Sequence, residues 1–67
     1  MSWRAGADLF REMFPLMQKH VENDEFRAEL VRDLIHFFMK CDMDGTDLRR
    51  VHPEIERALD ALDVDEG

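Results

Sequence analysis

Apolar residues recur at intervals of three and four along three stretches of this 67-residue chain. That spacing places side chains on one face of an α-helix, whereas a half-buried strand alternates polar and apolar residues. No stretch alternates over the length of a strand, and β-branched residues are sparse. The sequence therefore predicts an all-α domain, a small three-helix bundle over residues 1–67, with flexible or loosely packed ends at 1–6 and 63–67.

The first predicted helix runs from about residue 8 to residue 22, and Asp8 is its expected N-cap. One arc of this helix carries Leu9, Phe10, Met13, Phe14, Leu16, Met17 and Val21. Pro15 lies in the interior, where it removes a backbone hydrogen bond. Because the apolar phase is unchanged across Pro15, which falls on the polar arc, we expect one bent helix. The alternative is a break, with Pro15 opening a second helix.

The second predicted helix, from about residue 24 to residue 39 or 40, has the widest apolar surface. Asn23 is its expected N-cap. Its apolar residues cover roughly 220° of the circumference, whereas a helix at the edge of a bundle needs only about 100° or somewhat more. We therefore expect this helix to lie between the other two, or to face a partner as well. The far side of the arc is the candidate interface, formed by Val31, Ile35, Phe38 and Met39.

The third predicted helix follows a turn at 42–45, in which Gly45 supplies backbone freedom and Thr46 is the expected N-cap. It runs from about residue 47 to residue 62 and carries an apolar stripe of Leu48, Val51, Ile55, Ala58, Leu59 and Leu62. Pro53 favours the first position of a helix, and the residue before a proline avoids the α conformation. The alternative is therefore a short turn at 46–51 and a helix that begins at Pro53, so the helix is bent or broken there.

The charge balance narrows the class of partner. The chain carries 16 acidic residues against 9 Lys and Arg, for a formal net charge of −7. Proteins bind nucleic acids and anionic membranes through Lys and Arg side chains, so neither is expected as a direct partner of this acidic chain. No apolar run approaches the ~20 residues that cross a bilayer. A single cysteine and the absence of an apolar signal segment predict a cytoplasmic protein.

Residue types that carry metal or catalytic chemistry do not form a recognisable pattern. In a calcium-loop alignment with Gly45 at position six, the end ligands would be Lys40 and Val51, so a capped turn is favoured. No pair among His20, His36, His52 and Cys41 has zinc-ligand spacing. His20 and Cys41 are expected to be buried, and His36 to be solvated. We expect no metal, no cofactor and no enzymatic activity.

One segment resembles a known family. Asp44–Leu48, after a helix ending in His36-Phe37-Phe38, is similar to the middle of the colicin-type nuclease immunity proteins. Those are small acidic four-helix proteins that bind a basic nuclease domain. This chain has Arg49-Arg50 where that family has paired tyrosines, and it is about one helix shorter, so no functional residue is carried over.

Two functions are expected from these patterns. The first is a non-enzymatic protein-interaction module that self-associates, as a homodimer, through the second helix. Trp3 is expected to close the core rather than to anchor a partner. The alternative is an acidic monomeric inhibitor or regulator, resembling immunity proteins or nucleic-acid mimics, that binds a basic protein surface. Its candidate residues are Asp42, Asp44, Asp47, Glu54 and Asp60.

Overall fold

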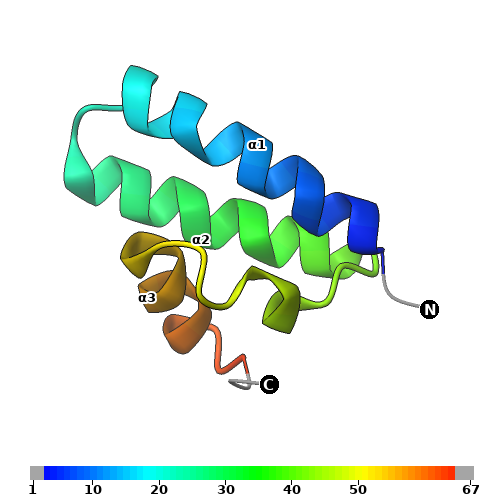
Figure 1. The fold of residues 1–67 in the computed structure, drawn as a ribbon. Coiled ribbons are helices and arrows are strands. Elements are labelled where there is room, and N and C mark those ends of the chain that lie inside the picture. Colours follow the sequence, from blue (N-terminus) through cyan, green and yellow to red (C-terminus); the bar gives the residue numbers. More distant parts are fainter. Residues whose placement is uncertain (1–2, 65–67) are drawn as a thin grey trace.

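The computed structural model describes residues 3–64, which contain four helical elements and no strand. These are α1 (Arg4–His20), α2 (Asp24–Lys40), the short 3-10 helix η1 (Gly45–Leu48) and α3 (Pro53–Ala61). α1 and α2 form an antiparallel hairpin (Figure 1), and α3 packs against α2 while its first turn also reaches α1, where Gln18 contacts Glu54. The prediction of a small all-α bundle with a central second helix is confirmed.

α1 begins four residues earlier than predicted. Trp3 occupies the N-cap position without a side-chain cap bond, and Asp8 lies inside the helix, where it pairs with Arg11 one turn later. Asp8 is therefore not the N-cap. Pro15 is exposed inside an uninterrupted helix, which confirms one continuous helix rather than a break.

α2 begins where the sequence indicates. The Asn23 side chain accepts hydrogen bonds from the backbone N–H groups of Glu25 at 2.9 Å and Phe26 at 3.0 Å. The turn after α2 differs from the prediction, because Asp42, at φ 76°, adopts the left-handed conformation expected of a glycine. Gly45 serves close approach instead, since a Cβ there would lie 2.9 Å from Cγ1 of Val64.

The third segment follows the second of its two predicted forms. η1 ends at Leu48, and α3 begins at Pro53 after a link in which Arg49 and His52 are extended and Arg50, at φ 68°, is left-handed. Asp44, not Thr46, caps η1, because its carboxylate accepts from the Thr46 N–H at 3.0 Å. The His52 ring caps α3, with Nδ1 accepting from the Glu54 N–H at 3.1 Å.

One apolar cluster fills the space between the helices. Its buried members are Ala7, Phe10, Phe14, Met17, Val31, Ile35, Phe38, Met43, Leu48, Ile55, Ala58 and Leu59. The Trp3 ring packs 5.5 Å from that of Phe38, and Val64 packs against the cluster. Residues 1–2 and 65–67, in the two ends predicted to be flexible or loosely packed, lie outside the described residues.

Candidate interaction surface

The structure corrects the choice of interface residues on α2. Val31 and Ile35 have no exposed surface, Phe38 is buried and Met39 packs against the core. These four side chains hold the bundle together and are not available to a partner as predicted. A helical wheel gives the angles between side chains, but it does not say which part of a 220° arc faces the neighbouring helices.

The exposed part of the α2 arc is formed by three other residues. Phe26 is 67% exposed, Phe37 59% and Leu30 36%. Their spacings of four and seven place them on one line along the helix. α1 carries a similar line, because Leu9 and Leu16, seven residues apart, are 47% and 56% exposed.

The α1 line points away from α3. On α1, Gln18 reaches towards α3 and donates to Oε2 of Glu54 at 3.3 Å. At 100° per residue, Leu9 and Leu16 lie about 160–180° around the helix from Gln18.

The α2 line points away from α3 as well. A groove of about 530 Å³ separates α2 from α3, and Ala28 and Arg32 line its α2 wall. Phe26, Leu30 and Phe37 lie roughly opposite that wall on the helix.

The two lines therefore flank the contact between α1 and α2 on one side of the hairpin. Half-buried Met13 and Leu34 lie between them by helical phase. We call this surface the outer face and define it by Leu9, Leu16, Phe26, Leu30 and Phe37. Its five large apolar side chains are between 36% and 67% exposed.

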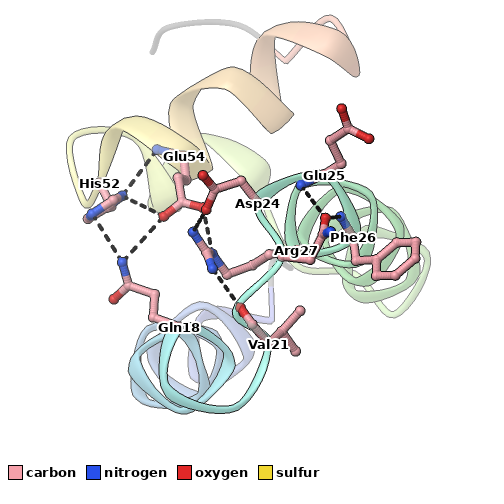
Figure 2. A network of polar contacts seen from close by, with 9 residues as sticks. Gln18, Val21, Asp24, Glu25, Phe26, Arg27, His52 and Glu54 are labelled. Carbon is pink, nitrogen blue, oxygen red and sulfur yellow. Dashed lines mark hydrogen bonds and ion pairs between the residues drawn. The ribbon is translucent and has the colours of Figure 1, made fainter.

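The opposite side of the hairpin carries a polar network that joins three helix ends (Figure 2). Arg27 donates from Nε to Oε1 of Glu54 at 2.7 Å, from NH2 to Oδ1 of Asp24 at 2.6 Å and from NH1 to the carbonyl of Val21 at 2.6 Å. The bond from Arg27 is the main cause that lowers the pKa of Glu54. His52 packs against Phe14 in a tilted arrangement, with ring centroids 4.8 Å apart. The network therefore ties the end of α1 to the first turns of α2 and α3.

A second arginine secures the other end of α3. Arg49 donates to Oε2 of Glu56 at 2.8 Å and to the carbonyl of Val64 at 2.6 Å, and it pairs with Asp60 at 2.8 Å. Glu56 also accepts from the Arg50 N–H at 2.5 Å, which is the main cause of its lowered pKa. Sequence reasoning missed both arginine networks, because their partners are far apart in the chain. Arg27 and Glu54 are 27 residues apart, and Arg49 and Val64 are 15 residues apart.

The five predicted acidic residues do not form a set of free carboxylates. Asp44 caps η1, Glu54 binds Arg27, and Asp60 pairs with Arg49. Asp42 is exposed, with its backbone carbonyl bonded to the Trp3 N–H, and Asp47 is half-buried in η1. The α2–α3 groove is also mixed in charge, with three arginines and three carboxylates on its walls. The acidic binding surface stays a prediction.

The predicted burial of the side chains that could bind a metal is partly wrong. His20 and Cys41 are exposed rather than buried, while His36 is exposed as predicted. Residues 3–64 hold no group of three or more His, Cys, Asp or Glu side chains arranged to bind a metal ion.

Among the described residues, no helix has both the length and the apolar character needed to cross a bilayer. Comparisons with protein-family models, with curated proteins and with solved structures find no match to this chain.

Proposed function

We propose that this chain is a non-enzymatic protein-interaction module that self-associates through its outer face. The observation that carries the proposal is the exposure of Phe26 and Phe37 on one line of α2. The domain buries three other phenylalanines, Phe10, Phe14 and Phe38, in its core, yet it leaves more than half of the surface of these two exposed. Two exposed aromatic side chains on one helix face, next to aliphatic neighbours, favour burial against another protein.

The expected affinity follows from the size of the outer face. Burying a Leu or Phe side chain that was fully exposed contributes about 1.5–3 kcal/mol. The outer-face residues are partly exposed, so each contributes a fraction of that. Association costs at least about 4 kcal/mol in lost freedom. We therefore expect a dissociation constant in the micromolar range, roughly −8 kcal/mol at 1 μM.

The test is the solution mass, measured by sedimentation equilibrium from low to high micromolar concentration at low and high salt. A dimer that persists at high salt is expected, because apolar contacts are not screened. The variant Phe37→Asp should be monomeric. Ala28→Asp is the matched control, since it adds the same charge at an exposed position of the same helix that faces the groove.

A wild-type monomer at every concentration and salt would overturn the proposal. Equal loss of the dimer in Phe37→Asp and Ala28→Asp would also overturn it, because the effect would then come from charge rather than from the outer face.

A further inference from the structure

We propose that the outer face takes a second copy of this chain across a two-fold axis, with the two α2 helices antiparallel. Phe26 of each copy then packs against Phe37 of the other, and Leu9 against Leu16 of the other. This inference rests on the proposed function and adds the partner's orientation. It is argued from two independent patterns, the positions of the apolar residues and the order of charges along α2.

The apolar positions are self-complementary. The point midway between Phe26 and Phe37 falls between residues 31 and 32, and the point midway between Leu9 and Leu16 falls between residues 12 and 13. α1 and α2 run antiparallel and are joined by three residues centred on Glu22 (Figure 1). Both midpoints lie nine and a half residues from Glu22, so they lie close together across the hairpin. A single two-fold axis at this level therefore pairs the α1 line with the α1 line of the other copy, and the α2 line with the α2 line of the other copy.

The order of charged residues beside the α2 line is compatible with the same two-fold axis. Glu25, Glu29, His36 and Lys40 are exposed and share an arc of about 60° next to that line. The arc is acidic in the N-terminal half of α2 and basic in the C-terminal half. The axis brings Glu29 within about 3 Å along the helix of His36 in the other copy, and Glu25 equally close to Lys40. A parallel pair would instead oppose like charges at all four of these positions, whereas the antiparallel pair brings like charges together only at Asp33 near the axis.

These patterns select a second copy over an unrelated partner. A protein that carries −7 repels its own copies in general, so self-association needs local attraction. The charge order on α2 supplies it only when the facing helix has the same order in reverse, which an antiparallel copy provides. Opposed helix dipoles favour the same orientation.

Asp33 marks the axis. It lies between Leu30 and Phe37 on the α2 line and is exposed. In the antiparallel pair, the two Asp33 residues are separated by only about 4–5 Å along the helix axis, whereas the two Lys40 residues are about 25 Å apart. The two positions therefore report orientation directly.

The first experiment is cross-linking in a Cys41→Ser background with a short bis-maleimide reagent. Asp33→Cys should give a covalent dimer, and Lys40→Cys should not. Efficient cross-linking of Lys40→Cys would show a parallel pair and overturn the inference. Failure of both variants, in samples that sedimentation shows to be dimeric, would place a surface other than α2 at the axis and overturn it as well.

The second experiment reverses charge at each end of α2. Glu25→Lys/Glu29→Lys and His36→Glu/Lys40→Glu should each dimerise at least about tenfold more weakly than wild type. Their equimolar mixture should restore a dimer as tight as wild type, because opposite charges then meet at both ends. No weakening in either variant would overturn the orientation while leaving a wild-type dimer, and thus the proposed function, intact. A monomeric wild type would overturn both.

Discussion

The guanidinium of Arg27 on α2 donates through Nε to Oε1 of Glu54, in the first turn of α3, at 2.7 Å. Both side chains are mostly shielded, with 11% and 18% of their surface exposed. The same guanidinium holds Val21 after α1 and Asp24 in the first turn of α2. A single side chain thus fixes how the ends of three helices meet (Figure 2).

Arg27→Met should lower the melting temperature by roughly 5–10 °C, because the variant keeps the apolar stem but leaves Glu54 without its charged partner. The control is Arg11→Met, which removes an exposed pair with Asp8 within one helix. Such pairs contribute little, so the control should melt within about 2 °C of wild type. Circular dichroism at 222 nm measures both. Equal melting of the two variants would contradict a special role for Arg27.

Acid should destabilise the fold through Glu54 and Glu56. The Arg27 bond lowers the pKa of Glu54 below its ordinary value of 4.5, and the Arg50 N–H lowers that of Glu56. Each carboxylate therefore binds a proton less readily in the folded chain than in the unfolded chain. The stability they contribute is complete above about pH 4.5 and is lost as the pH falls through the lowered folded pKa.

The matched variant for this titration is Glu54→Gln/Glu56→Gln. It should melt below wild type at pH 7, and the gap should narrow as the pH falls below 4.5 and through the lowered folded pKa values, where the wild-type carboxylates take up protons too. Thermal melts from pH 7 to pH 2.5 measure the gap. A gap of constant size across this range would show that the two carboxylates do not act through their charge.

Substitutions at Ile35 and Phe37 should separate effects on folding from effects on association. Ile35 is fully buried, so Ile35→Val should reduce the free energy of unfolding by about 0.5–1.5 kcal/mol. Phe37 is mostly exposed, so Phe37→Ser should change the unfolding of the monomer by less than about 0.5 kcal/mol. Urea titrations at a concentration below the dissociation constant measure both. A larger loss for Phe37→Ser than for Ile35→Val would mean that Phe37 belongs to the core.

Local chemistry explains which parts of the fold could be predicted. Asn23 caps α2 by bonds to residues two and three positions away, and Pro53 opens α3 because of its own ring, so both appear in a short sequence window. The identity of the buried residues on α2 is different. Ile35 and Phe37 are both apolar and both lie within the same wide arc, and only the placement of α1 and α3 buries the first and exposes the second.

Long-range polar contacts were beyond sequence reasoning for a related reason. Arg27 and Glu54 are 27 residues apart, and apart from Asp24 near Arg27 nothing close to either residue distinguishes it from the other charged residues of the chain. The prediction of the turn after α2 failed for a local reason. The left-handed conformation occurs at Asp42, a residue type that tolerates it, and not at the nearby Gly45. For the Arg27 network, the one signal available in the sequence was Asp24, three residues before Arg27, at the spacing of an ion pair within a helix.

Gly45 and Val64 should show coupled effects on stability. A Cβ at Gly45 would lie 2.9 and 3.1 Å from the two methyl carbons of Val64, which is too close for an undisturbed contact. Gly45→Ala should therefore cost about 1–3 kcal/mol of unfolding free energy through overpacking. Val64→Ala removes the obstructing methyl groups, so Gly45→Ala should cost much less in that background.

The double-mutant cycle, measured by urea unfolding, should give a coupling of about 1 kcal/mol or more in the stabilising direction. Additive effects would show that the cost of Gly45→Ala comes from the backbone of η1 rather than from its contact with Val64. The outcome bears on the fold as a whole, because this contact and the Arg49 bond to the Val64 carbonyl hold the segment after α3 against η1. A strong coupling would mean that this segment is part of the folded unit and stabilises the turn from which α3 begins.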